Sequence, residues 1–304
     1  MSATPVPSPT WADLEPGLLI GLALLAGLAV ATGLVLRLKR QIGTGSLREQ
    51  VTSWWLLLPP VFVAWALRPA GLILLVLLLS VLAAIELARL SDRPASRLAA
   101  PGLLLALATQ CVLLSRGLPL AGIAAMATLA LAALAVRHFM STARRDTLLL
   151  ALFAAQAAGL GCLAALAAGP SPRAADWCLY LCIVTALNDI GQYLVGTRFG
   201  RHRMTTRISP NKTWQGFGGG LVFSAIFSMS IGRALGLATL PWLAAVGLVL
   251  SVAGLSGDLF FSAGKRALGI KDYGTLIPGH GGILDRVDSL VLTAPVLLIA
   301  LCPH

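Results

Sequence analysis

Long apolar stretches with few or no charged side chains make up most of this chain, and they restrict its fold more than any other feature. A helix needs about 20 apolar residues to cross the hydrocarbon core of a bilayer, which is about 30 Å thick. Ten stretches approach that length, at residues 18–36, 51–67, 69–85, 98–115, 117–136, 147–169, 177–195, 217–232, 234–257 and 289–302. We therefore predict an all-α, polytopic integral membrane protein with about ten transmembrane helices.

The composition of the chain argues against a soluble protein. Apolar residues make up 57% of the 304 residues and charged residues only 12%, whereas a soluble domain carries roughly 25% charged residues. The five cysteines lie in apolar stretches and form no CxxC pair, so we interpret them as small core residues. No basic segment precedes the first apolar stretch, so we expect that stretch to remain as a helix rather than to be cleaved as a signal peptide.

The basic residues are distributed unevenly between the predicted loops. The net charge is +11, an excess that could bind nucleic acid but that also occurs in cytoplasmic loops of membrane proteins. If residues 1–17 form a short extracytoplasmic tail and each stretch crosses once, four of the 23 Lys and Arg residues face outward and the other nineteen face the cytoplasm. The four are Arg68, Arg116, Arg173 and Arg233. We therefore predict a multi-pass cell-membrane protein with its N-terminus outside and no nucleic-acid partner.

Residues 18–304 contain no linker and no fixed repeat, so we predict a single membrane domain. The two longest polar segments, 196–216 and 258–288, both fall on the predicted cytoplasmic side. We therefore expect the catalytic part to lie at about 177–290.

The segment 258–288 combines acidic residues, basic residues and glycines. Asp258, Ser262 and Lys265 stand at positions i, i+4 and i+7, which share one face of a helix. Gly269 is typical of a helix end, and the glycine-rich loop around His280 would let backbone N–H groups approach an anion. A last helix starting near residue 283 would direct its positive end at the same place, so a phosphate would fit there.

Acids and bases in this segment favour phosphoryl or nucleotidyl transfer. Asp285 and Asp288 lie three residues apart on one helix face, where two carboxylates repel unless a cation lies between them. Together with Asp258 they could hold Mg²⁺, which prefers oxygen ligands and keeps water or phosphate in its other positions. A salt-bridged juxtamembrane loop is the alternative, but it does not account for the glycines. The bases that would hold phosphates are Lys265, Arg266, Lys271 and Arg286.

Two earlier features are candidates for the same site. Asn188 and Asp189 lie at membrane depth in the predicted cytoplasmic half of their helix. An ionisable side chain at that depth indicates a functional site. The alternative is that the two residues are only a polar pair at the end of a helix. Ser209, followed by proline, is typical of a helix N-cap, which would place Lys212 and Thr213 in a first turn able to bind an anion. The loop could equally act only as a positive cytoplasmic determinant.

The 27 residues from Ser262 to Asp288 resemble the C-terminal signature of phosphatidate cytidylyltransferases, also called CDP-diacylglycerol synthases. The resemblance continues upstream and covers about 188–289, a third of the chain. The matching residues of the signature are Ser262, Lys265, Arg266, Lys271, Asp272, His280, Gly281, Gly282, Asp285, Arg286 and Asp288. Upstream they are Asn188, Asp189, Gly196, Gly200, Ser209, Pro210, Lys212, Thr213, Gly216, Gly257, Asp258 and Leu259.

Three residues depart from the pattern of the family. Asn211 stands where a lysine is usual, Gln215 where a glutamate is usual, and Gly264 where an aliphatic residue is usual. These departures leave open a divergent subgroup or an altered substrate.

The resemblance implies transfer of CMP from CTP to phosphatidic acid, which yields CDP-diacylglycerol and pyrophosphate for phospholipid biosynthesis. It implies Mg²⁺ as cofactor on Asp258 and Asp285, with Asp288 as a ligand or neighbour. Lys265 and the other bases would hold the triphosphate and the lipid phosphate, and Lys212 would assist. No covalent intermediate or general base is required, because a phosphate monoester is already anionic near neutral pH.

Two other functions remain open at this point. A CTP-dependent lipid-alcohol kinase of the polyprenol type would transfer the γ-phosphoryl group and release CDP. A cation-coupled transporter would use Asp189, Asp258 and Asp285 as ion sites, but it predicts acids in both halves, and the first six stretches offer only Glu86. The oligomeric state is also left open, a homodimer included.

Overall fold

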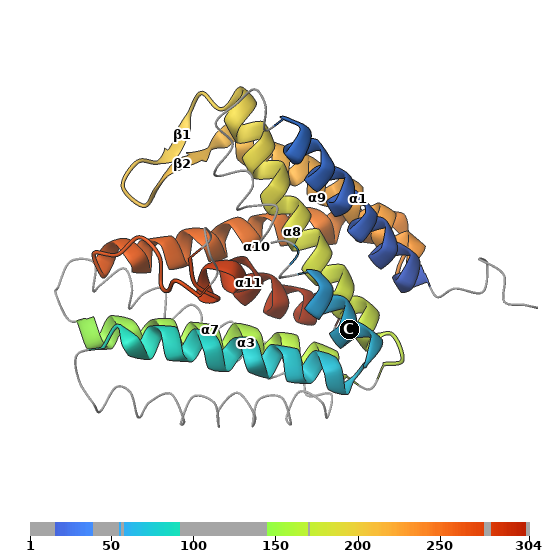
Figure 1. The fold of residues 1–304 in the computed structure, drawn as a ribbon, viewed down its shortest axis with the longest axis horizontal. Coiled ribbons are helices and arrows are strands. Elements are labelled where there is room, and N and C mark those ends of the chain that lie inside the picture. The colour runs from blue at the N-terminus through green and yellow to red at the C-terminus, as the bar shows by residue number, and fades with distance from the viewer. Residues whose placement is uncertain are drawn as a thin grey trace, which may run out of the picture.

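The structure is a computed structural model that describes residues 16–38, 55, 58–91, 145–169, 171–276 and 281–301. The described residues are mainly helical, as the sequence predicts (Figure 1). The elements are α1 (Pro16–Leu38), α3 (Ala70–Arg89), α7 (Arg145–Ala167), α8 (Ala174–Phe199), β1 (Arg203–Thr205), β2 (Ser209–Thr213), α9 (Trp214–Ala234), α10 (Leu240–Ala267) and α11 (Leu284–Ala300).

Five of the described helices, α3, α7, α8, α9 and α10, are long and apolar enough to cross a membrane. Their outward faces expose large apolar side chains such as Leu74, Val222 and Val252, which suit contact with lipid. These findings confirm the prediction of an all-α polytopic membrane protein. The predicted stretches 98–115 and 117–136 lie outside the described residues, so the number of ten spans stays a prediction.

The helices pack in a chain of neighbours in which α8 contacts α9, α9 contacts α10, α10 contacts α11, and α11 contacts α7, which packs on α3. In Figure 1, α3 and α7 form one layer and α10 and α11 lie above it, while α8 and α9 run obliquely between the hairpin and the opposite end of the bundle. At one end of the bundle α3, α8 and α10 end while α7, α9 and α11 begin. The loops at this end therefore bring residues that are far apart in sequence close together.

A glycine sets the distance between α10 and α11. A Cβ atom on Gly257 would lie 2.5 Å from the backbone oxygen of Asp288, so any larger residue would push the two helices apart. The close approach places Asp258, the next residue of α10, beside the first turns of α11.

The segment before α9 differs from the prediction. Residues Ser209–Thr213 form strand β2, which pairs antiparallel with β1, so the prediction that Ser209 is an N-cap and that Lys212 and Thr213 lie in a first helical turn is wrong. The N-cap is Thr213, whose Oγ1 accepts a hydrogen bond of 3.0 Å from the backbone N–H of Gly216. A two-stranded hairpin tolerates Pro210 because both of its strands are edges.

The predicted end of α10 and start of α11 are confirmed. Gly269 follows α10 with φ +72°, and the N–H of Ile270 donates to the carbonyl of Lys265 at 2.9 Å, which closes the helix in a Schellman motif. The last helix begins at Leu284, one residue after the predicted position. His280 lies outside the described residues.

Candidate active site

Two lysine–aspartate pairs lie at the end of the bundle where the hairpin is. The Nζ atom of Lys212, from β2, is 2.6 Å from Oδ2 of Asp258 in α10, and Nζ of Lys265 is 2.9 Å from Oδ1 of Asp285 in α11. All four side chains are at least three-quarters buried. We call the set Asp189, Lys212, Asp258, Lys265, Asp285 and Asp288 the acid–lysine cluster.

The helical face predicted for α10 carries part of this cluster. Ser262 Oγ donates a hydrogen bond of 3.1 Å to Oδ1 of Asp258, one turn earlier. Lys265 bonds Asp285 and lies near enough to Asp258, on the same face of α10, for its charge to attract that carboxylate as well. Asp258 and Asp285 therefore lie at the same end of the molecule, as the predicted site requires.

Asp285 has both carboxylate oxygens occupied by the protein. Its Oδ1 binds Lys265, and its Oδ2 accepts 2.9 Å hydrogen bonds from the backbone N–H groups of Tyr273 and Gly282. The carboxylate therefore ties α11 to α10 and to the loop between them. In this arrangement Asp285 supports the loop and positions Lys265.

Three carboxylates from different helices face one another beside these pairs. Asp288 is buried near enough to Asp258 and Asp189 for their negative charges to repel its own, and near enough to Lys265 to be attracted by it. Ser289 Oγ donates to Oδ2 of Asp189 at 3.1 Å, which fixes α8 against α11. The structure thus brings Asp189 to the same place as the acids of the signature segment.

A network of uncharged side chains continues from the cluster into the bundle. The Asn188 Nδ2 atom donates to Asp189 at 3.3 Å, and its Oδ1 accepts from Ser224 at 3.2 Å and from Ser251 at 2.6 Å. Hydrogen bonds of this kind stabilise contacts between helices where water is absent. Asn188 therefore joins α8 to α9 and α10 directly behind the acids.

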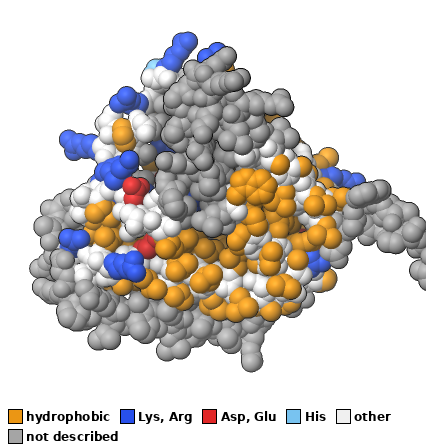
Figure 2. Space-filling model, in the orientation of Figure 1, with side chains coloured by type: hydrophobic (Ala, Val, Ile, Leu, Met, Phe, Trp, Pro, Cys, Tyr) orange, Lys and Arg blue, Asp and Glu red, His pale blue; other side chains and the backbone are white. Residues whose placement is uncertain are grey.

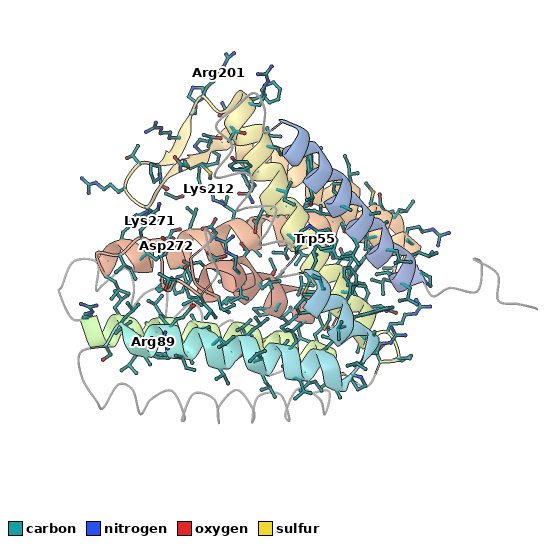
Figure 3. All side chains as sticks on the ribbon, in the orientation of Figure 1. Trp55, Arg89, Arg201, Lys212, Lys271 and Asp272 are labelled. Carbon is teal, nitrogen blue, oxygen red and sulfur yellow. The ribbon has the colours of Figure 1, made fainter. Side chains whose placement is uncertain are left out.

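The remaining predicted bases lie at the rim of the cluster. Arg266 is exposed, and its guanidinium donates to the carbonyl groups of Ile208 and Ile270, so it fastens the hairpin to α10. Lys271 and Arg286 are exposed at the same end. Figure 3 shows Lys212 on the side of the hairpin that faces α10, and Lys271 at the same end of the bundle. Figure 2 shows Lys and Arg side chains gathered around exposed acids at this end.

Sequence reasoning missed the part played by Glu86 of α3. This side chain is only 5% exposed, and its two oxygens accept hydrogen bonds from the backbone N–H groups of Ile283 at 2.9 Å and Leu284 at 3.0 Å. A carboxylate in this position satisfies free N–H groups and complements the positive end of α11. The signal in the sequence was that Glu86 directly follows the apolar stretch 69–85, where a charged side chain is costly unless it is paired.

Sequence reasoning also missed Gln192, which follows Asn188 by one turn of α8. Its Oε1 accepts a 3.0 Å hydrogen bond from Nζ of Lys212. The spacing of four residues was the available signal, because it places both amides on one helix face.

Electrostatics keep Lys212 charged and Tyr273 neutral. Burial opposes the charge on Lys212, but the attraction of Asp258 and Asp189 outweighs it, so the pKa of Lys212 is raised above its usual value. Burial raises the pKa of Tyr273 well above its usual value, and its hydroxyl donates to the carbonyl of Phe261 at 2.8 Å. Tyr273 therefore holds the loop to α10 as a neutral side chain.

The donors of the cluster suit a hard cation that keeps other ligands. Mg²⁺ in enzymes is usually held by one or two carboxylates and completes its shell with water and substrate phosphates. Within the described ranges, no three His, Cys, Asp or Glu side chains already form a metal-binding group. Asp258 and Asp288 lie on adjacent helices and are the candidates for the two-carboxylate arrangement. Like Asp285, Asp258 has both oxygens bonded in the structure, to Lys212 and Ser262, whereas among the residues that the structure describes Asp288 has only its Oδ1 bonded, by the backbone N–H of Ser289.

The structure thus defines a polytopic membrane protein with a buried set of carboxylates and ammonium groups at one end of an apolar helical bundle. The chain belongs to the cytidylyltransferase family, whose sequence profile matches residues 48–302.

Individual relatives match the chain over a shorter stretch. It is 49% identical over 119 residues to "Uncharacterized protein YnbB" of Escherichia coli strain K12, which is 39% of this chain and 40% of that protein. It is 44% identical over 121 residues to a phosphatidate cytidylyltransferase of Mycobacterium leprae, covering 40% of this chain and 38% of the relative. The identity to the enzyme of the same name from Staphylococcus aureus strain COL is 44% over 124 residues, 40% of this chain and 48% of the relative. The matches thus span less than half the length of these relatives.

Proposed function

We propose that the protein is a phosphatidate cytidylyltransferase that transfers CMP from CTP to phosphatidic acid. The observation that carries the proposal is the acid–lysine cluster, in which Lys212 and Lys265 pair with Asp258 and Asp285 at the end of a membrane bundle. A lipid phosphate can reach such a site while its acyl chains stay in the bilayer. The relatives named phosphatidate cytidylyltransferase support the same reaction.

In the proposed reaction a phosphate oxygen of phosphatidic acid attacks the α-phosphorus of CTP. A new P–O bond forms to the lipid phosphate, the bond from the α-phosphorus to the bridging oxygen breaks, and pyrophosphate leaves. The attacking phosphate is already anionic, so the protein mainly has to position the two substrates and neutralise their charge.

Lys212 and Lys265 supply the positive charge in this proposal. In the structure each ammonium faces an aspartate, which keeps it charged and oriented while it is buried. When phosphates enter, both ammonium groups would donate hydrogen bonds to phosphate oxygens. Arg266, Lys271 and Arg286, at the rim, would attract the anionic substrates.

Mg²⁺ would be held by Asp258 and Asp288, and when bound it would neutralise charge on the phosphate oxygens. Asp285 positions Lys265 in the structure, and its role as a metal ligand stays a prediction from the sequence. Asp189 would complete the negative surroundings of the ion.

The site would face the cytoplasm, where CTP is available. Arg173 directly precedes α8 and Arg233 lies in the last turn of α9, so both are at the opposite end of the bundle from the cluster, where the Arg173 guanidinium contacts the carbonyl of Gly236. An excess of basic residues at the end with the cluster supports a cytoplasmic orientation of that end.

The test is a product analysis with the purified full-length protein in lipid vesicles. We expect CTP labelled at its α-phosphate, phosphatidic acid and Mg²⁺ to yield labelled CDP-diacylglycerol and unlabelled pyrophosphate. Release of CDP with phosphorylation of an added lipid alcohol would instead identify a kinase. Ion flux across the vesicles without turnover of CTP would identify a transporter, and either result would overturn the proposal.

A further inference from the structure

We propose that Gln192 is a substrate-binding residue whose side-chain amide donates a hydrogen bond to a phosphate oxygen of CTP or phosphatidic acid. The inference rests on the proposed function and adds a neutral donor to a site otherwise made of charged groups.

The amide nitrogen of Gln192 has no protein partner. The residue is 6% exposed, and its Nε2 is the only fully buried side-chain nitrogen or oxygen in the described ranges that lacks a hydrogen bond. Neighbouring polar groups in the same interior are satisfied, as Asn188 is by Ser224 and Ser251. A buried donor left without an acceptor is unfavourable, so its presence beside the cluster indicates an acceptor that arrives with a ligand.

The orientation of the amide follows from the chemistry of Lys212. An ammonium group can only donate, so the Gln192 side chain must present its oxygen to Nζ, which it does at 3.0 Å. The NH₂ group is therefore directed elsewhere. A Cβ atom on Gly220 would lie 2.5 Å from Cγ of Gln192, so the helix α9 encloses the side chain closely and limits its rotation.

The surroundings select an anionic oxygen as the acceptor. Lys212 bonds both Gln192 and Asp258, so a phosphate bound by this ammonium would lie within one side chain of the Gln192 amide. A phosphate group has several acceptor oxygens, so one can accept from the ammonium and another from the NH₂ group. An NH₂ group cannot bind a cation, so Gln192 serves the phosphate and not the metal.

The experiment replaces Gln192 with methionine, which keeps the length of the side chain but cannot donate. Gln192→Met removes the unsatisfied donor and also the oxygen that accepts from Lys212, which keeps its pair with Asp258. We expect the two effects to offset each other, so that the variant inserts and melts within a few degrees of the wild type. We expect the KM for one of the two substrates to rise about 10- to 100-fold, with the other nearly unchanged. The substrate affected identifies the phosphate that Gln192 binds. Gln192→Glu, which adds a negative charge beside the phosphate, should weaken the same substrate further.

Gln156 of α7 provides a matched control. Gln156 is also buried, but its Nε2 donates a hydrogen bond of 3.1 Å to the carbonyl of Ser80. This bond joins α7 to α3, in the layer that these two helices form (Figure 1). Gln156→Met should lower the melting temperature and leave both KM values unchanged. That pattern is the reverse of the one expected for Gln192→Met.

Binding measurements separate this inference from the proposed function. Equilibrium binding of labelled CTP and of pyrophosphate is compared between wild type and Gln192→Met, with no turnover needed. If the wild type makes CDP-diacylglycerol and Gln192→Met has the same KM values and binding constants, the role of Gln192 alone is overturned. If the wild type binds CTP but makes no CDP-diacylglycerol, and Gln192→Met no longer binds CTP, the proposed function alone is overturned. If the wild type binds and turns over neither substrate, both are wrong.

Discussion

At the scale of single residues, the site depends on charges that neutralise one another while they are partly shielded from water. Lys212 faces Asp258, and Lys265 faces Asp285, at distances of 2.6 and 2.9 Å. Removing one member of such a pair leaves the other charge buried and uncompensated. Single substitutions in the cluster should therefore alter activity strongly.

Asp258→Asn should lower the turnover of CTP at least about 100-fold, because the variant loses a proposed metal ligand and the charge that orients Lys212. The rate of CDP-diacylglycerol formation at saturating Mg²⁺ measures the effect. The control is Asp176→Asn, at the other end of α8, where the carboxylate accepts a hydrogen bond from Trp65. Near-normal turnover in Asp258→Asn would contradict the assignment.

The raised pKa of Lys212 predicts a particular dependence on pH. The pKa of Lys212 is higher in the folded protein than its usual value of 10.5 in an unfolded chain. The charged ammonium therefore stabilises the folded protein fully below pH 10.5, and this stabilisation is lost as the pH rises through the pKa of the folded state. The difference in melting temperature between wild type and Lys212→Met should therefore stay constant from about pH 7 to 9. It should shrink only above pH 10.5. A difference that disappears near neutral pH would show that Lys212 is not held as an ammonium.

At the scale of secondary-structure elements, α3 holds the start of α11 and the loop before it. Besides the two hydrogen bonds that Glu86 accepts, Gly274 and Gly282 lie so close to its carboxylate that a Cβ atom on either would overlap it. The N-terminal half of the chain therefore positions the segment that carries Asp285 and Asp288.

Glu86→Gln should loosen this connection, because an amide has one acceptor oxygen and no charge to complement the helix end. We expect a local loss of about 1–3 kcal/mol and faster hydrogen exchange at residues 282–284. The kcat should fall more than the KM rises, since substrate contacts remain. Ser80→Ala in the same helix is the control, because the Ser80 hydroxyl bonds only within α3, to Val76. Unchanged exchange in Glu86→Gln would contradict the role of Glu86.

The contact between α10 and α11 gives a second prediction at this scale. Gly257→Ala would force the α10 backbone away from Asp288, so we expect about 1–3 kcal/mol of destabilisation and a loss of Mg²⁺-dependent turnover. A Cβ atom on Gly218 of α9 would meet nothing within 4 Å, so Gly218→Ala should be close to neutral. Melting temperature and activity of the two variants provide the comparison. Equal behaviour would mean that the close approach of α10 and α11 is not required.

At the scale of the whole molecule, the helices alternate in direction, so one end of the bundle collects the hairpin, the start of α11 and the end of α10 (Figure 1). Arg201 lies at that end, in the loop that precedes β1, and Arg233 lies in the last turn of α9 at the opposite end. The proposed orientation places these two arginines on different sides of the membrane.

Labelling of intact cells checks this orientation. With a maleimide that cannot cross the membrane, Arg233→Cys should be modified from outside, and Arg201→Cys only after the cells are made permeable. The wild type, whose described cysteines are largely buried in the bundle, shows the background reaction. Labelling of Arg201→Cys in intact cells would reverse the proposed topology.

The sequence alone was sufficient for features that depend on local spacing or on apolar length. The helices α3, α7, α8, α9 and α10, the bond from Ser262 to Asp258, and the end of α10 at Gly269 involve residues within a few turns of one another. Ser209 with its proline suits both an N-cap and an edge strand, and only pairing with β1 decided for the strand.

Other parts of the site required the tertiary structure. Glu86 meets Ile283 across 197 residues of sequence, and Lys212 meets Asp258 only because α8, α9 and α10 pack together. Such contacts are set by the relative positions of helices, which the period of apolar residues does not encode. The sequence therefore determined which acids and bases the protein carries and next to which apolar stretches they stand. Helix packing decided which acid faces which base, because Lys212 and Lys265 each pair with an aspartate on another element.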